Sequence, residues 1–135
     1  MSMTFSVKSS GGGACGRFEG TLHCAEDGEN ALVMTEDGDL DWMGLRRPAF
    51  RVTRLVVPGD EPGLGQVMFE DGRHFHDLDL RSGEYEPTHP CAPDVYRGRF
   101  VAHGPDEWSY EWLVGGPRKD LRLTSRLSRQ RPANR

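Results

Sequence analysis

The chain has 135 residues and a formal charge of −4, with 17 Lys and Arg against 21 Asp and Glu. This length suits one domain with a modest core, and the excess of acids argues against a nucleic-acid partner. The three cysteines have no disulfide or zinc-binding spacing, so we expect a reduced, cytoplasmic protein. Since the sequence contains neither an 18-residue apolar run nor a signal core, we expect no membrane association and no export.

The two ends of the chain differ in composition from its middle. A stretch near the N-terminus ends in Ser-Ser-Gly-Gly-Gly, a composition typical of linkers. We therefore expect residues 1–13 to be a flexible lead-in, residues 14–130 to form the domain and residues 131–135 to be a tail. The basic run from Arg118 to Arg135 indicates a last strand with a solvated face rather than a polyanion site.

Short alternating runs of apolar and polar residues recur between Gly, Pro and Asp, which is typical of an all-β protein. The triplet Glu-Asp-Gly ends at Gly28, Gly38 and Gly72, and Asp-Gly supplies the positive φ of a tight hairpin, so each triplet predicts a chain reversal. About eight or nine strands joined by short turns predict a single antiparallel up-and-down barrel with room for one small ligand.

A pair of histidines follows the third of these turns, in the stretch FEDGRHFHDLDL from Phe69 to Leu80. In a regular strand His74 and His76 share one face with two leucines, and Phe75 faces the other side. Two imidazoles on an apolar face fit a metal site, a proton-transfer site or a polar corner of the core.

Two later strands and the segment before them carry the other candidate residues. The side chains that alternation predicts to face inward there include Asp94, Tyr96, Phe100, Trp108, Tyr110 and Trp112. The Pro-rich segment SGEYEPTHPCAPD before Val95 is expected to be a rim loop. His89 and Cys91 would then lie near one opening of the barrel.

The order of three motifs in the C-terminal half resembles Domain of Unknown Function family 6314. The motifs are FEDGRHFHDLDL, THPCAPDVYRGRF and EWSYEWLVGGPRKDLRLTSRLSR. The matching positions are Asp71, Gly72, Arg73, Phe75, His76, His89, Cys91, Asp94, Tyr96, Trp112, Gly116, Pro117, Arg118, Lys119 and Asp120. The resemblance implies a lipocalin-like, or calycin-like, barrel and says little about chemistry. His74 is outside the motif.

Acid/base catalysis on a small apolar carbonyl compound, without a cofactor, is the chemistry that these residues favour. His76 or His89 would exchange protons, Asp94 would orient the imidazole and Tyr96 would donate to an oxyanion. Such a set suits an isomerase, a cyclase or a dehydratase of the lyase type. The expected substrate contacts are Arg73, Cys91, Trp108, Tyr110, Trp112 and Lys119.

Two other functions stay open from the sequence. The first is a metal site made of His74, His76, His89 and Cys91, because imidazole and thiolate suit zinc, copper or iron; haem held by His76 or His89 is a variant of it. The second is a non-catalytic carrier or sensor of an apolar ligand. In either case we expect a monomer or a homodimer.

Overall fold

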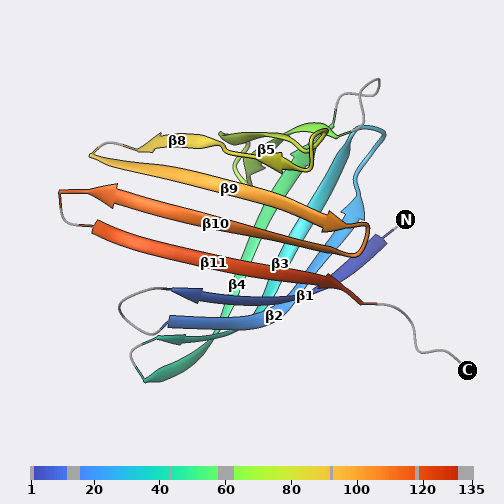
Figure 1. Cartoon of the computed structure of the whole chain (residues 1–135). Helices are drawn as coiled ribbons and strands as arrows, with labels where there is room; N and C mark the ends of the chain where they lie inside the picture. The colour runs from blue at the N-terminus through green and yellow to red at the C-terminus, as the bar shows by residue number, and fades with distance from the viewer. Residues whose placement is uncertain are drawn as a thin grey trace, which may run out of the picture.

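The structure is a computed structural model that describes residues 2–11, 16–42, 44–57, 63–91, 93–117 and 119–130. Eleven antiparallel strands form one sheet in this part of the chain (Figure 1). They are β1 (Ser2–Gly11), β2 (Gly16–Glu26), β3 (Ala31–Trp42), β4 (Leu45–Val56), β5 (Leu64–Phe69), β6 (His74–Asp79), β7 (Glu84–Tyr85), β8 (Thr88–Cys91), β9 (Asp94–Gly104), β10 (Glu107–Gly116) and β11 (Lys119–Arg129).

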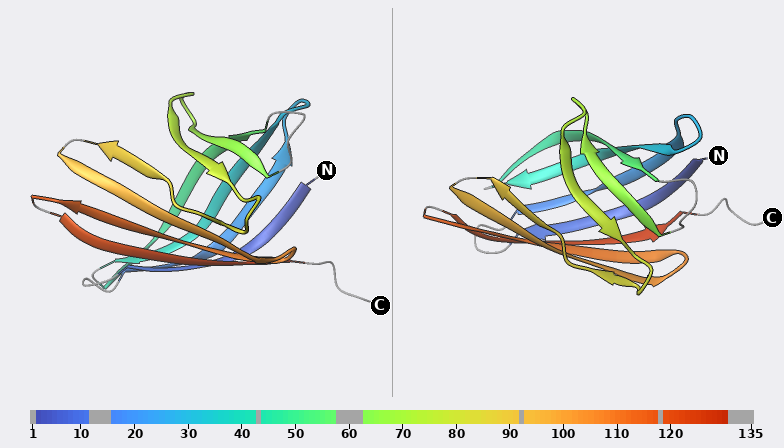
Figure 2. Two further views of the ribbon diagram at one scale, coloured as in Figure 1. Left: turned by 45° about the horizontal axis from the view of Figure 1, so that its top comes forward. Right: turned by 90° about the horizontal axis from the view of Figure 1, so that it is seen from above.

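The sheet curls into a nearly closed barrel. Its strand order is β6-β5-β4-β3-β2-β1-β11-β10-β9-β7, and β8 also pairs with β9. Pairing of β1 with β11 joins the first strand to the last, while β6 and β7 end the sheet and share no ladder in the described chain. Figure 2 shows β5 and β6 lying across the open side of the curved sheet. The expected all-β antiparallel barrel is confirmed, but it is nearly closed rather than closed and has more strands than the eight or nine predicted.

The first strand is the main correction to the predicted domain boundaries. Ser2–Gly11 is not a flexible lead-in, because β1 pairs with β2 on one side and β11 on the other. Its alternate residues Phe5 and Val7 are 8% and 1% exposed, so they belong to the core. Residues 1, 12 and 13 and the expected tail 131–135 lie outside the described residues.

Two of the three Glu-Asp-Gly triplets are turns and one is not. Gly28 and Gly72 have φ of 79° and 91°, which the reversals there require. Gly38 instead lies within β3, paired with Gly20 of β2. A Cβ atom on Gly38 would stand 2.6 Å from the Gly20 Cα atom, so this glycine allows two strands to approach closely. Glu36 is consequently a strand residue.

A β-bulge changes the predicted faces of β6. Val67 pairs with His76 and Met68 with His74, which leaves Phe75 as the extra residue. A bulge turns two consecutive side chains toward the same side, and both Phe75 and His76 line the barrel cavity. His74 is correspondingly on the outer face, so the predicted common face of His74 and His76 is wrong.

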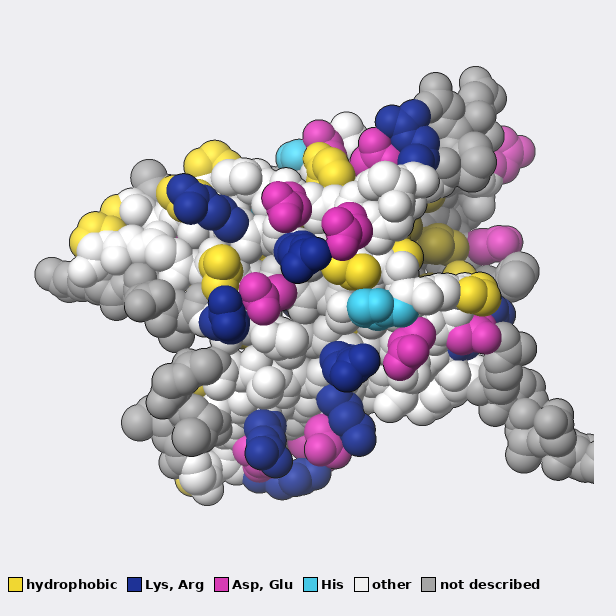
Figure 3. All heavy atoms as spheres, in the orientation of Figure 1, with side chains coloured by type: hydrophobic (Ala, Val, Ile, Leu, Met, Phe, Trp, Pro, Cys, Tyr) yellow, Lys and Arg dark blue, Asp and Glu magenta, His cyan; other side chains and the backbone are white. Residues whose placement is uncertain are grey.

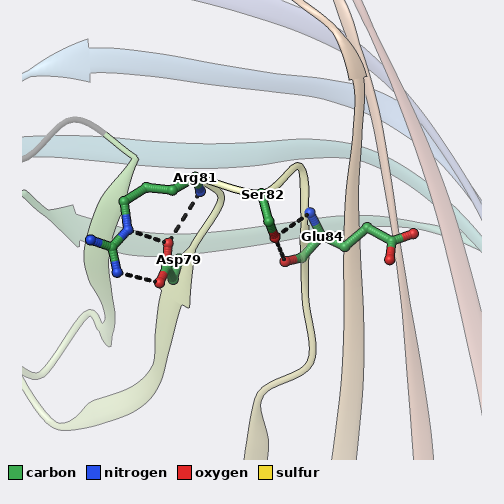
Figure 4. A network of polar contacts seen from close by, with 4 residues as sticks. All are labelled: Asp79, Arg81, Ser82 and Glu84. Carbon is green, nitrogen blue, oxygen red and sulfur yellow. Dashed lines mark hydrogen bonds and ion pairs between the residues drawn. The ribbon is translucent and has the colours of Figure 1, made fainter.

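The outside of the barrel is covered by small ion pairs. Figure 3 shows Lys and Arg interspersed with Asp and Glu on one face. In the connection from β6 to β7, Arg81 donates to Asp79 from its backbone and its guanidinium, and the Ser82 hydroxyl donates to the Glu84 carbonyl (Figure 4). Exposed pairs of this kind contribute little to stability. The described residues form no helix long enough and apolar enough to cross a membrane.

Candidate ligand cavity

The barrel encloses a cavity of about 320 Å³. Nine strands contribute lining residues, because alternation turns every second side chain of each strand inward. Most of these residues are aliphatic or aromatic. Ala102 and Gly104, near the end of β9, are exposed lining residues and mark a rim of the cavity.

One wall of the cavity is aromatic and comes from β6, β9 and β10. The rings of Phe75 and Trp112 are stacked with centroids 5.3 Å apart, and those of Phe100 and Tyr110 are stacked at 5.1 Å. The Trp108 ring is stacked 6.3 Å from Phe100 and lies 5.7 Å from Tyr110. Stacked and edge-on rings of this kind give the wall a fixed, flat surface.

His76 is the polar residue within the aromatic wall. The side chain is 4% exposed and contacts the rings of Phe75, Phe100 and Trp112. Its Nδ1 atom lies 2.7 Å from the Asp77 carbonyl oxygen, which can only accept, so Nδ1 donates and carries the proton. Burial lowers the pKa of His76, and the ring is therefore neutral near pH 7.

The other ring nitrogen of His76 contacts the cavity. Among the described residues, the Nε2 atom of His76 has no hydrogen-bond partner. Nε2 is not among the fully buried atoms without a partner, so it must be partly accessible. His76 is also a lining residue of the cavity. Nε2 is therefore an available acceptor, or base, that faces the space inside the barrel.

Across the cavity lies an ion pair between β3 and β4. The Arg51 Nη2 atom is 3.3 Å from the Glu36 Oε2 atom, and both side chains line the cavity. Burial, the largest single influence, lowers the pKa of Arg51, but Glu36 and Tyr110 together outweigh it and the pKa is raised. The Arg51 side chain is still 54% accessible, although it lies inside the barrel, so part of its guanidinium faces cavity space.

A chain of hydrogen bonds connects this ion pair to the opposite wall. Tyr110 is hydrogen-bonded to both Arg51 and Ser125, and the Ser125 and Ser9 hydroxyl oxygens are 2.7 Å apart. Burial raises the pKa of Tyr110, so its hydroxyl is protonated. Glu36, Arg51 and Tyr110 also line a second, smaller cavity of about 230 Å³. These bonds, called the polar crossing below, therefore lie between the two cavities.

Cys24 of β2 completes the titratable lining residues described here. It is 5% exposed, and burial raises the pKa of its thiol to about 11. A thiol with this pKa is protonated near neutral pH and is a poor nucleophile. Cys24 therefore acts as a small apolar wall residue.

The structure brings together four of the predicted site residues. His76, Trp108, Tyr110 and Trp112 all line the main cavity. The expected apolar wall is thus where the sequence placed it, although Tyr110 has a polar role as well.

The remaining members of the predicted acid/base set lie beyond the cavity. His89 and Tyr96 are ring neighbours at 6.0 Å, and their rings also contact Phe75 and Trp112 respectively. Neither residue lines the cavity, and nor does Asp94, whose carboxylate packs against Gly116. The predicted convergence of His76, Asp94 and Tyr96 on one cavity is therefore wrong. The predicted rim loop instead forms β7 and β8, which pair with β9.

Two further candidates point away from the barrel interior. Arg73 binds Asp71 and lies over the Phe69 ring, and His74 is 2.9 Å from an Asp77 carboxylate oxygen on the exposed face. The set His74, His76, His89 and Cys91 is thus divided between two faces. The described residues hold no group of three or more His, Cys, Asp or Glu placed for a metal. The side chains of Cys91 and Lys119 lie outside the described ones.

Sequence reasoning missed Glu36 and Arg51. The Glu-Asp-Gly triplet places Glu36 in a turn, and Arg51 lies on the less apolar face of its strand. In β4 the inner residues are Ala49, Arg51, Thr53 and Leu55, whereas Phe50, which borders the second cavity, and Val56 are 68% and 37% exposed. Counting the apolar residues on each face of β4 therefore predicts the wrong face as the inner one. The useful signal would have been an acid and a base at paired positions of adjacent strands, since Glu36 pairs with Arg51.

Several solved structures have a fold similar to that of this chain. The S-type phycobiliprotein lyase CPES from Guillardia theta has a TM-score of 0.66 and 13% identity, over 98% of this chain and 88% of that chain. The redesigned β-barrel mFAP1, bound to DFHBI, has a TM-score of 0.51 and 13% identity, over 93% and 91%. A fluorescence-activating β-barrel designed de novo has a TM-score of 0.52 and 11% identity, over 94% and 91%. At these identities the likeness shows the fold alone.

Sequence comparison gives the family. A search of curated proteins finds none that matches. Residues 2–129 match the model of DUF6314, a family of unknown function. The match covers β1 as well as the motifs of the C-terminal half that suggested it. Because it spans almost all of the 135 residues, the chain belongs to the DUF6314 family.

Proposed function

We propose that this barrel binds one small, mostly apolar molecule in its main cavity. The cavity of about 320 Å³ carries this proposal, since ligand pockets start near this size. Its lining has the composition of such a pocket, with a continuous aromatic wall and few polar groups. The mFAP1 barrel, of similar fold, is bound to DFHBI, which supports the use of such a barrel for a ligand.

The test compares two variants of neighbouring residues in β4. One variant fills part of the cavity, and the other places the same side chain outside it. Thr53→Phe adds a ring to the cavity, while Val52→Phe adds the same ring on the outer face of β4. We expect Thr53→Phe to weaken the binding of 6-hydroxy-2-naphthamide about tenfold or more, measured by titration calorimetry. Val52→Phe should bind like the wild type. Equal affinities of the two variants would overturn the proposal.

Acid/base chemistry on the bound molecule is the second candidate. It is favoured by one observation, the neutral His76 ring whose Nε2 atom contacts the cavity. As a base, Nε2 would take a proton from a carbon next to a carbonyl group, and Arg51 or Tyr110 would donate to the oxygen of the enolate. This assignment replaces the predicted set of His89, Asp94 and Tyr96 with residues of the cavity itself.

Exchange of hydrogen for deuterium tests that chemistry without knowledge of the natural substrate. A small aromatic ketone such as 2-tetralone loses its α-protons to D₂O when a base removes them, which proton NMR records. We expect the protein to accelerate this exchange and His76→Gln to remove the acceleration while the ketone still binds. Acceleration that survives in His76→Gln would show that His76 is not the base. Exchange that the protein never accelerates would leave binding alone as the function.

A further inference from the structure

We infer that the cavity selects an uncharged ligand with hydrogen-bonding groups at two ends, an acceptor toward Arg51 and Tyr110 and a donor toward His76. This inference rests on the proposed function, because it specifies the ligand of the same cavity. The ligand would be a neutral aromatic carbonyl compound, an amide or a ketone. It would carry a hydroxyl or N–H group at the end opposite the carbonyl group.

The charge of the lining residues carries the first half of the inference. Among the described lining residues, the formal charges are those of Glu36 and Arg51, which form an ion pair with each other. His76 and Cys24 are neutral at pH 7, as argued above from their burial. A carboxylate on the ligand would therefore add an uncompensated charge to an apolar space, which is costly. A carbonyl oxygen adds none.

The geometry of Arg51 provides the place for that carbonyl oxygen. A guanidinium has five N–H donors, and Arg51 uses them toward Glu36 and Tyr110 while much of the side chain remains accessible from the cavities. The ion pair is a single contact of 3.3 Å rather than a two-pronged one. Arg51 thus keeps donors for a ligand without releasing Glu36.

The second half of the inference comes from His76. Its Nδ1 proton is fixed on the Asp77 carbonyl, so Nε2 can only accept, and a ligand must bring a hydrogen to satisfy it. The Phe100 ring lies between the two polar ends, with its centroid 5.1 Å from the His76 ring and 5.1 Å from the Tyr110 ring. A flat aromatic body that lies along Phe100 can therefore reach both ends.

A matched pair of compounds tests the charge preference. 6-Hydroxy-2-naphthamide and 6-hydroxy-2-naphthoate share one body and differ by a neutral or an anionic end at pH 7.5. We expect the wild-type protein to bind the amide about tenfold more tightly or better, by titration calorimetry. If neither compound binds, the proposed function is overturned together with the inference. If the naphthoate binds as well or better, the inference fails and the proposed function stands.

Variants of the ion pair give an independent readout of the same preference. Glu36→Gln leaves Arg51 without its carboxylate, so the ratio of affinities should move toward the naphthoate by about tenfold or more. Arg51→Gln makes the opposite charge change and should move the ratio further toward the amide, which keeps the test valid if one variant fails to fold. Glu111→Gln is the matched control, because Glu111 pairs with Arg122 on the outer face of β10. If the ratio of the affinities for the amide and the naphthoate is the same in Glu36→Gln and Arg51→Gln as in the wild type, the inference is overturned.

The donor end is tested by removing the hydroxyl group from the ligand. 2-Naphthamide should bind the wild type about fivefold more weakly than its 6-hydroxy form. In His76→Phe the two amides should bind equally, because Phe keeps the ring and removes the acceptor. A hydroxyl contribution that persists in this variant overturns the assignment of His76.

Discussion

Two parts of this barrel contain an acid, a base and a phenol, and they differ in where the chain brings them from. His89, Asp94 and Tyr96 are close in sequence and lie where β8 pairs with β9, outside the main cavity. The polar crossing takes Glu36, Arg51 and Tyr110 from three strands that are far apart in sequence, and all three line the cavity. The residues that are close in sequence therefore form the cluster beyond the cavity. The cluster inside the cavity is formed by strand pairing between residues that are far apart in sequence.

The largest expected effect concerns Trp112, which contacts Tyr96 of the outer cluster and lines the cavity together with the polar crossing. Its ring lies 6.4 Å from Tyr96 and 5.3 Å from His76, and it is 8% exposed. We expect Trp112→Ala to lower the free energy of unfolding by about 3–5 kcal/mol, measured by urea denaturation. Leu113→Ala, at an outward position that is 40% exposed, should cost less than about 1 kcal/mol. Similar losses in both variants would contradict the role of Trp112 as a shared wall.

The next effect separates the polar crossing from the surface ion pairs. Arg51→Met leaves the Glu36 carboxylate facing an apolar cavity, and we expect a loss of about 2–3 kcal/mol in unfolding free energy. Arg46→Met removes an exposed pair with Asp39 and should cost less than about 1 kcal/mol. Glu36→Leu combined with Arg51→Met should recover most of the loss, since no unpaired charge remains. A double variant as unstable as Arg51→Met would contradict this account.

A smaller effect is the dependence of stability on pH. Burial lowers the pKa of His76 in the folded state, so below its unfolded pKa of about 6.5 the unfolded chain binds the proton more readily. The contribution of His76 to stability is therefore complete above that pH and is lost as the pH falls toward the folded pKa. Denaturation midpoints measured from pH 7.5 to pH 5 should fall for the wild type more steeply than for His76→Gln. Parallel curves would show that His76 is not buried as a neutral ring.

The smallest effects are expected from the cluster beyond the cavity. Tyr96→Phe keeps the ring beside Trp112 and removes a hydroxyl that the cavity does not contact. Binding of 6-hydroxy-2-naphthamide should stay within about twofold of the wild type, by the same calorimetric titration. A large loss in Tyr96→Phe, with none in Arg51→Gln, would reverse the comparison between the two regions.

The strands of the barrel were readable from local pattern, because alternation and turn chemistry depend on neighbours in sequence. Trp108, Tyr110 and Trp112 follow the regular period of two, so their inward direction was predicted correctly. The N-terminal strand was missed because its serines and the glycines that follow resemble a linker. Pairing on both sides, with β2 and β11, orders Ser2–Gly11.

The rest of the candidate site depended on features that a local pattern does not contain. The bulge at Phe75 exchanges the faces of two neighbouring residues and becomes visible only in the pairing with β5. Gly38 supports a close approach to Gly20 rather than a turn, and this placed Glu36 inside the barrel. Arg51 lies on the inner face of β4, and this face is less apolar than the outer face of the same strand. The inner face can carry a charge because Arg51 lines a cavity beside Glu36. Each error traces to the pairing of one strand with its neighbour or to the cavity, neither of which the pattern within one strand contains.

The sheet ends at β6 on one side and at β7 and β8 on the other, and this gap determines how the barrel can deform. The rings of Phe69 and Phe75 contact the His89 ring across it, with centroids 6.1 and 5.2 Å apart, while the described strands form no ladder there. Elsewhere around the barrel, separating two strands breaks a row of backbone hydrogen bonds. Here it separates side-chain rings, among them those of Phe75 and His89. We therefore expect the barrel to widen along this line more readily than between its hydrogen-bonded strands.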